Sequence, residues 1–185
     1  PFTMHGRSCS NEKQSFVDFD NAEFAKLGIE TFAKNKRKKI LMIAPPLDQS
    51  YGLEMVMSAK NSAQNHNISL KVIPNITSDS SIEAISAAVT EEISINKNFD
   101  GILVASPNSA MAAVAGFENL GLKIGKDIDL VAKDAVNFLK LFRNEIIVIR
   151  EDMDIAGGKL ALAAIHAVQN PDLEPLQYID QPKFY

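Results

Sequence analysis

Short apolar runs alternate with helical patterns between residues 20 and 134, and this alternation limits the possible folds more than any other feature. The runs "KILMIAPP", "LKVIP", "GILVA" and "DLVAK" supply four predicted strands, of which the first is continuously apolar, as in strands buried on both faces of a sheet. Parallel strands need crossover connections, and each crossover helix covers a face of the sheet. The sequence therefore predicts an α/β fold with an open parallel sheet and helices on both faces.

Capping signals mark where the helices begin. Asp20 with Glu23, and Ser80 with Glu83, resemble capping boxes, and Ser106 before a proline is a suitable N-cap. After Asp134 the rhythm breaks, and a last helix is followed by a proline-punctuated tail. The predicted helices begin near residues 20, 50, 80, 106 and 154.

Composition narrows the class of protein. The chain has 185 residues, which suits about one domain, and its net charge of -4 gives no broad cationic surface for nucleic acid. Its one basic run, residues 34–39, is either a nucleic-acid contact or a solvated helix end, where cations are favoured. The single cysteine, Cys9, forms no internal disulfide framework, and no apolar run approaches the length of a membrane span.

Motifs for catalysis and cofactor binding are lacking. The sequence contains neither a P-loop nor a G-x-G-x-x-G pattern, and Ser109 is not in a G-x-S-x-G elbow. His5, His66 and His166 have no carboxylate or cysteine at metal-ligand spacing. The prediction is therefore that the chain is not an enzyme and has no cofactor or metal.

Positions that follow the predicted strands are the candidates for ligand binding, because open α/β sheets bind ligands beyond the carboxyl ends of their strands. Asp134 follows the fourth strand, as a ligand contact or as a turn or cap aspartate. Glu151, Asp152 and Asp154 are either a paired-carboxylate site or negative charge at a helix N-terminus. Met55 is either a gap-filling core residue or a ligand contact.

The stretch "DGILVASPNSAMAAVAGFENLGLKIGKDIDLVAKDA" resembles the effector-binding domain of the LacI/GalR family of bacterial transcription regulators. In that family an Ala-rich helix leads to a Gly-Leu-x-(Val/Ile)-Gly-x-Asp turn and a strand that ends in aspartate. "PFTMHGR", "FVDFDN", "KKILMIAPPLDQS" and "IIVIREDMDIAGGKLALAAI" are similar to further family segments, in the same order. The resemblance covers essentially the whole chain.

The resemblance implies a periplasmic-binding-protein-like fold of type I, with two subdomains and a small effector between them. The chain then looks N-terminally truncated and consists mainly of the C-terminal subdomain. The expected division is 1–19 as a remnant of the N-terminal subdomain, 20–145 as the C-terminal effector-binding subdomain, 146–170 as a segment that crosses back, and 171–185 as the final strand of the C-terminal subdomain.

The resemblance also implies site residues. Asp134 stands where the family's aspartate accepts hydrogen bonds from the ligand, whereas Met55 occupies a position where sugar- and purine-binding members commonly have arginine, so a bidentate contact is lost. Ser106-Pro107 replaces the usual Asn-Asp, and Lys133 could favour an anionic group. The candidate ligand-binding residues are Asp134, Gln49, Tyr51, Met55, Ser106, Lys133 and Glu151.

The implied function is ligand-responsive repression of transcription. The expected partners are a small, sugar-like effector, DNA through an N-terminal helix-turn-helix that this sequence does not contain, and a second copy of the chain in a homodimer; the expected location is the cytoplasm, with no membrane partner. The main alternative is a periplasmic solute-binding protein of a sugar transport system. An enzyme on a flavodoxin-like sheet is a third possibility, with no catalytic constellation to support it.

Overall fold

The computed structural model describes residues 2–7 and 14–185, so Pro1 and Cys9 lie outside the described residues. The strands form a six-stranded sheet, in the order β4-β3-β5-β6-β7-β9, and a three-stranded sheet, in the order β1-β2-β8. The six strands are β3 (Lys39–Ile43), β4 (Ser69–Val72), β5 (Gly101–Val104), β6 (Asp129–Asp134), β7 (Ile147–Arg150) and β9 (Lys183–Phe184). The three strands are β1 (Thr3–His5), β2 (Ser15–Phe19) and β8 (Gln177–Asp180).

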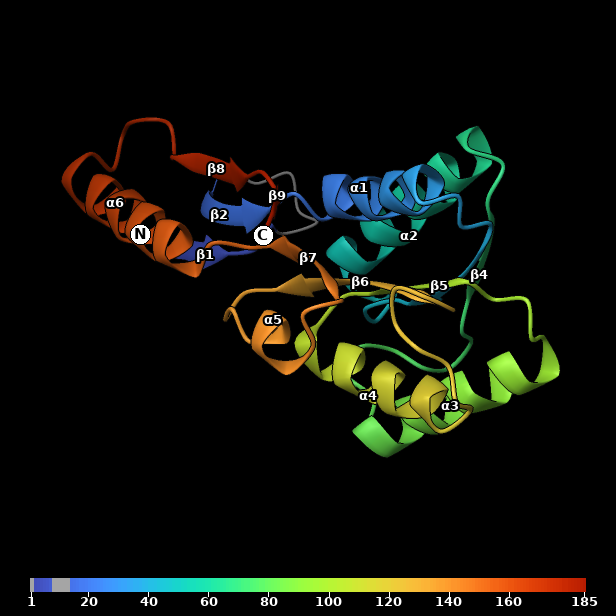
Figure 1. Ribbon diagram of the computed structural model, residues 1–185. Helices are drawn as coiled ribbons and strands as arrows, with labels where there is room; N and C mark the ends of the chain where they lie inside the picture. The colour runs from blue at the N-terminus through green and yellow to red at the C-terminus, as the bar shows by residue number, and fades with distance from the viewer. Residues whose placement is uncertain (1, 8–13) are drawn as a thin grey trace.

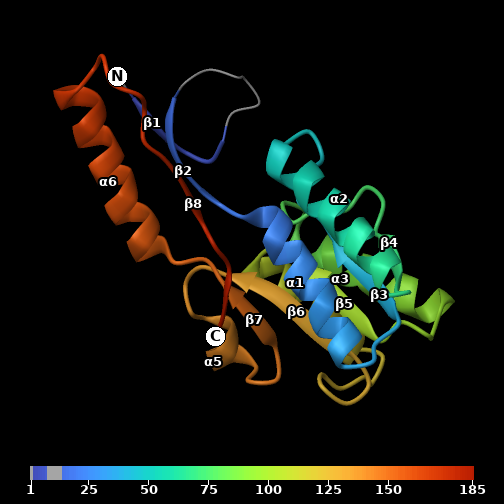
Figure 2. The ribbon, with the colours of Figure 1, turned by 90° about the horizontal axis from the view of Figure 1, so that it is seen from above.

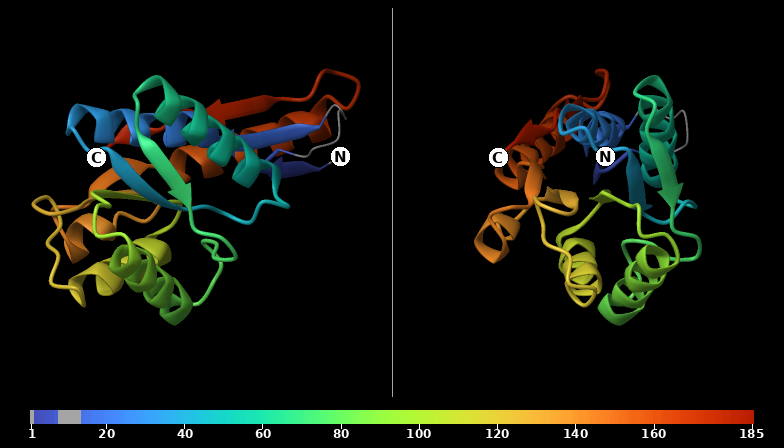
Figure 3. Two further views of the ribbon diagram at one scale, coloured as in Figure 1. Left: turned by 90° about the vertical axis from the view of Figure 1, so that its right-hand side faces the viewer. Right: turned by 45° about the vertical axis from the view of Figure 1, so that its right-hand side comes forward.

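The large lobe contains the six-stranded sheet and five helices. Helices α1 (Asn21–Lys34) and α2 (Ser50–Asn65) cover one face, and α3 (Ile82–Ile95) and α4 (Pro107–Glu118) cover the other (Figure 1 and Figure 3). The short helix α5 (Leu139–Phe142) follows β6. The predicted α/β fold with a mostly parallel sheet between helices is confirmed.

Side chains of β3 alternate between two apolar clusters. Ile40 and Met42 pack in the cluster beneath α1 and α2, whereas Leu41 and Ile43 pack in the cluster beneath α3 and α4. All four side chains are fully buried. This is why the strand is apolar at successive positions rather than at every second one.

The small lobe contains the three-stranded sheet and α6 (Met153–Gln169). Its strands pair in parallel, and α6 packs along β1 and β2 (Figure 2). The outward side of α6 carries Leu162, Ile165 and Val168, each more than half exposed. None of the described helices is both long enough and apolar enough to span a membrane.

Three chain segments within residues 14–185 connect the lobes. They run from β2 to α1, from β7 to α6, and from β8 to β9. The first and third are joined side by side, because Asp20 donates its backbone N–H to the Asp180 carbonyl at 2.9 Å and Gln181 Nε2 donates to Asp20 Oδ2 at 3.3 Å.

Two of the three expected helix caps are confirmed. Asp20 Oδ1 accepts a hydrogen bond from Glu23 N at 2.8 Å, and Ser106 is the N-cap of α4. The cap expected at Ser80 is wrong by one residue, because Ser81 Oγ accepts from Ala84 N at 3.2 Å. Ser80 Oγ instead accepts from Thr77 N and stabilises the preceding turn.

The chain leaves the large sheet later than the expected boundary after residue 145. Strand β7 pairs in parallel with β6, and the crossing to the small lobe follows Arg150. Residues 171–185 contribute β8 to the small sheet and β9 to the large one, where a single strand in the large lobe was expected. An apolar run does not specify which sheet it joins, because pairing depends on partners distant in sequence. The division into domains stays a prediction.

Candidate functional site

A cleft of about 570 Å³ lies between the two lobes. Its large-lobe wall comes from the ends of β3, β4, β5, β6 and β7 and the segments that follow them, and its small-lobe wall from the ends of β1 and β2. Strand β3 lies between β4 and β5, so the crossover from β3 to β4 and the crossover from β4 to β5 run in opposite directions across the sheet. Such a reversal opens a crevice at the carboxyl ends of the strands, and the cleft lies there.

Five of the predicted site residues line this cleft: Gln49, Tyr51, Ser106, Lys133 and Glu151. A close backbone approach positions the first two. A Cβ atom on Gly52 would lie 2.2 Å from the Pro46 carbonyl oxygen, so this turn requires glycine. Partial burial, followed by the charges of Asp79 and Asp48, raises the pKa of Tyr51 above its ordinary value, which keeps its hydroxyl protonated.

Asp134 is not among the lining residues. Its side chain is buried, with Oδ1 accepting from Val136 N and Oδ2 accepting from Leu139 N, both at 2.8 Å. Both oxygens therefore hold the turn between β6 and α5, as the turn or cap alternative expects. The neighbouring residues Lys133 and Ala135 face the cleft instead.

Met55 also lies outside the cleft lining, where a ligand contact was one of its two expected roles. It is fully buried in the cluster beneath α1 and α2, as the alternative of a gap-filling core residue expects. Its neighbour Glu54 lines the cleft. The Met55 side chain is apolar and can be buried without loss of hydrogen bonds, whereas burial of the Glu54 carboxylate would be costly.

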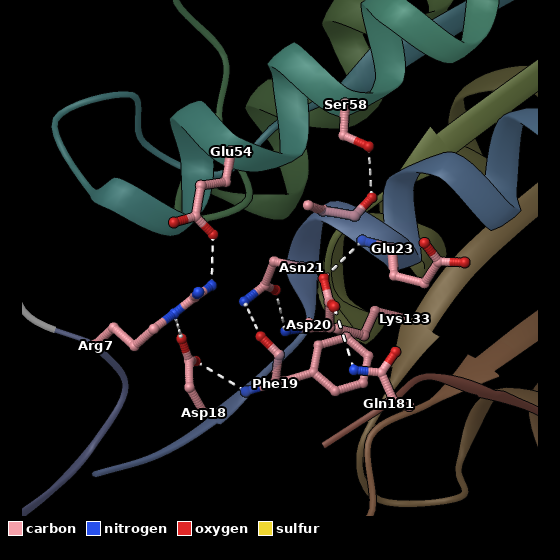
Figure 4. A network of polar contacts seen from close by, with 11 residues as sticks. Arg7, Asp18, Phe19, Asp20, Asn21, Glu23, Glu54, Ser58, Lys133 and Gln181 are labelled. Atoms are coloured by element: carbon pink, nitrogen blue, oxygen red, sulfur yellow. Dashed lines mark hydrogen bonds and ion pairs between the residues drawn. The ribbon is translucent and has the colours of Figure 1, made fainter. Parts of the chain in front are cut away.

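Arg7 bridges the two lobes at the cleft. Its Nε donates to Asp18 Oδ2 at 2.6 Å within the small lobe, and its Nη2 donates to Glu54 Oε2 at 2.6 Å on α2 of the large lobe (Figure 4). Asp18 Oδ1 accepts from Phe19 N at 2.8 Å, which fixes that carboxylate. Burial lowers the pKa of Arg7, but the hydrogen bond to Asp18 and the charges of Glu54 and Asp18 outweigh it, so the pKa is raised.

Lys133 is likewise engaged within the protein. Its Nζ lies 3.1 Å from Glu151 Oε2, 3.4 Å from Asn21 Oδ1 and 5.1 Å from the centre of the Phe19 ring. Figure 4 shows it beside Phe19 and Asn21. His5 Nε2 lies 3.8 Å from the other oxygen of Glu151. The expectation that Lys133 favours an anionic group thus loses support, because a carboxylate already neutralises its charge.

The acidic run before α6 divides between two roles. Asp152 caps the helix by accepting from Ile155 N at 3.2 Å, and Asp154 lies in the first turn. Glu151 faces the cleft. The helix-charge interpretation therefore applies to the two aspartates only. Ser106 similarly lines the cleft while its Oγ accepts from Ser109 N at 3.2 Å.

Three charged cleft residues did not emerge as site candidates from the sequence: Arg7, Asp18 and Glu54. A fourth, Asp79, emerged only as part of a candidate segment, residues 75–79. Asp79 lies within a segment expected to follow a strand, and Arg7 and Asp18 lie in segments similar to family strands. The candidates were taken from the ends of the four predicted strands, all of which lie in the large sheet. The same reasoning applied to the strands of the small sheet would have indicated Arg7 as well. Within the described residues, no group of three or more His, Cys, Asp or Glu side chains could hold a metal ion.

Solved structures share the arrangement of both lobes. A LacI-family regulatory protein from Chloroflexus aggregans superposes with a TM-score of 0.88 at 18% identity, over 100% of this chain and 66% of that one. A LacI-family regulator from Enterococcus faecium with bound ribose gives 0.86 at 16% identity, over 100% and 68%. The regulator CelR in complex with cellobiose gives 0.87 at 17% identity, over 100% and 57%.

This chain has the LacI-regulator effector-domain fold. It spans about 57–66% of the length of the CelR and Chloroflexus aggregans proteins. No protein-family profile matches the sequence, and no curated protein matches it. The LacI-type fold accounts for the two lobes and for the three connections between them.

Proposed function

We propose that this chain is the effector-sensing part of a ligand-responsive transcription regulator, and that its effector is a sugar-like small molecule. The observation that carries the proposal is the cleft between the lobes, where hydroxyl, amide and carboxylate side chains accompany Tyr51 and Phe19. Such a mixture suits a hydroxylated ligand, since aromatic rings pack on its apolar faces and polar groups fix its orientation. The regulators solved with ribose and with cellobiose have the same fold.

The ligand acts on the lobe arrangement in this proposal. It contacts residues of both lobes and therefore favours one arrangement by its differential affinity, about 1–3 kcal/mol in typical allosteric coupling. A homodimer then transmits the shift to DNA-binding segments in the part of such regulators that this chain does not cover. The location that follows is the cytoplasm, and the chain itself carries out no catalysis.

Isothermal titration calorimetry with a panel of monosaccharides and disaccharides, including ribose and cellobiose, tests the sensing step. We expect at least one sugar to bind, and Gln49→Ala to weaken it about tenfold by removing a cleft amide. Gln64→Ala is the matched control, because Gln64 is exposed near the end of α2, the helix that Gln49 precedes, and lies outside the cleft lining. Equal losses in both variants, or no binding across the panel, would contradict the proposal.

DNA binding by a longer form of the chain that includes the proposed DNA-binding segments tests whether the sugar controls DNA affinity. A mobility-shift titration is run with and without the sugar found by calorimetry. The sugar is expected to change the affinity for DNA, and the affinity itself is expected to fall steeply as the salt concentration rises. Tight sugar binding with no DNA affinity at low salt would instead favour the solute-binding alternative.

A further inference from the structure

The charged side chains of the cleft are unequal in number. Two cations, Arg7 and Lys133, face four carboxylates, Asp18, Glu54, Asp79 and Glu151, so the lining has a formal charge of two minus four, or -2, with His5 neutral. Local negative charge of this kind concentrates cations and repels anions.

Both cations are already paired with carboxylates of the cleft lining. Arg7 donates to Asp18 and to Glu54, both at 2.6 Å, and Lys133 lies 3.1 Å from Glu151. A phosphate or carboxylate entering the cleft would meet cations whose charge is already neutralised and would lie among like charges. Juxtaposed like charges disfavour binding by several kcal/mol in protein interfaces, so anionic ligands are excluded.

Two carboxylates retain acceptor capacity on the large-lobe wall. The Arg7 bond to Glu54 uses Oε2, and within residues 2–7 and 14–185 no hydrogen bond engages Oε1 (Figure 4). Asp79 is exposed, and its side chain accepts only from the neighbouring Ser78 hydroxyl within those residues. Tyr51 lines the same wall.

We propose that the cleft selects a hydroxylated ligand that carries a positive charge, such as an amino sugar, with its ammonium group at Glu54, Asp79 and Tyr51. This inference rests on the proposed sensing function and specifies its ligand class. An ammonium group donates three hydrogen bonds, which suits two carboxylates, and a cation is attracted to an aromatic face. The hydroxyls then take the remaining wall, where Gln49 and Ser106 lie.

Charged nitroxide co-solutes test the electrostatic step without a known ligand. Paramagnetic relaxation of amide protons is measured with a cationic and with an anionic nitroxide of the same size, which differ in local concentration where the potential is strong. We expect the amides of Gly6, Gln49 and Ala135 to relax at least about twofold faster with the cationic probe. Faster relaxation with the anionic probe overturns the proposal.

Calorimetry with glucose, glucosamine, N-acetylglucosamine and glucose 6-phosphate tests the ligand class. The free amine is expected to bind at least about tenfold more tightly than the two neutral sugars, the usual size of one charge-assisted hydrogen bond, and the phosphate not to bind. Neutral or phosphorylated sugars that bind as tightly as the amine overturn the inference but leave sugar sensing intact. If the cationic nitroxide gathers in the cleft and no sugar binds, the sensing proposal fails instead.

Substitutions that remove one carboxylate charge test where the ammonium group of the ligand lies. Asp79→Asn is expected to reduce the advantage of glucosamine over glucose by about two- to fivefold, because an exposed charge contributes modestly, and Glu54→Gln by about tenfold. Asp172→Asn removes an exposed carboxylate outside the cleft lining and is expected to leave the ratio unchanged. A ratio that falls equally in Asp79→Asn and Asp172→Asn would show an effect of net charge alone and would overturn the assignment.

Discussion

The two lobes are both built mainly from parallel strand pairs but bury their side chains to different degrees. In the large lobe every residue of β5 is buried, because helices cover both faces of the sheet. In the small lobe the edge strand β8 alternates exposed and half-buried residues, as the edge strand β4 of the large sheet also does. The difference lies in the helices, since α6 leaves Leu162, Ile165 and Val168 more than half exposed. The comparison indicates that the large lobe provides most of the stability, and that the small lobe mainly completes the cleft.

Truncation of one apolar helix side chain in each lobe gives the largest expected difference. Phe32→Ala on α1 empties a fully buried site and is expected to lower the free energy of unfolding by about 3–5 kcal/mol. Leu162 on α6 is 59% exposed, so Leu162→Ala is expected to change the free energy of unfolding by no more than about 0.5 kcal/mol. Urea denaturation measures both, and equal losses would refute the comparison.

Glycines extend the comparison to the backbone. In Gly52→Ala the new Cβ meets the Pro46 carbonyl at 2.2 Å, and a loss of about 1–3 kcal/mol is expected as the loop is forced away. In Gly157→Ala the new Cβ on α6 meets nothing within 4 Å. This substitution is expected to stabilise the chain by about 0.5–1 kcal/mol, because alanine loses less conformational freedom in a helix than glycine. Thermal unfolding gives both signs, and a stabilised Gly52→Ala variant would show that the turn does not need glycine.

Two aspartates with different roles give the next comparison: one holds a turn in the large lobe, and the other places a charge at the start of a helix in the small lobe. Asp134→Ala leaves two backbone N–H donors without their acceptor and is expected to lower stability by about 1–2 kcal/mol. Asp154→Ala removes only a favourable charge in the first turn of α6, worth about 0.3–1 kcal/mol. Sugar affinity distinguishes the turn role of Asp134 from a ligand role: a loss of affinity at unchanged stability would restore the ligand-contact interpretation.

The bridge between the lobes has a smaller expected effect on stability than the buried side chain of Phe32 or the turn anchor Asp134. Arg7→Met removes both ion pairs of a partly exposed guanidinium, so a loss of about 0.5–1 kcal/mol is expected after screening by solvent. High salt is expected to reduce the difference between variant and parent. A difference that does not respond to salt would mean that packing of the arginine stem, rather than charge, joins the lobes.

The sequence predicted the large lobe well and the cleft only in part. Apolar runs and caps such as Asp20 and Ser106 are local signals, so four of the six strands of the large sheet and the four helices that cover its faces could be located from the sequence alone. The orientation of Glu54 rather than Met55 toward the cleft could not, since it depends on how α2 rotates against α1 and the sheet. The role of Asp134 was equally undetermined, because a strand-end aspartate serves a turn or a ligand with the same sequence.

The Arg7 bridge could not be predicted either. It joins Asp18 and Glu54, which are 36 positions apart in the chain and belong to different lobes. Long-range ion pairs leave no periodic trace in a single sequence, so only the fold brings these residues together.

Amide chemical-shift mapping during titration with the tightest-binding sugar tests the central claim most directly. If the cleft is the effector site, the largest shifts are expected at strand ends of both lobes, at Gly6 and Phe19 on one side and at Tyr51, Ala105 and Ala135 on the other. Shifts confined to one lobe, or centred on the groove between α1 and α2 around Met57 and Asn61, would contradict the account.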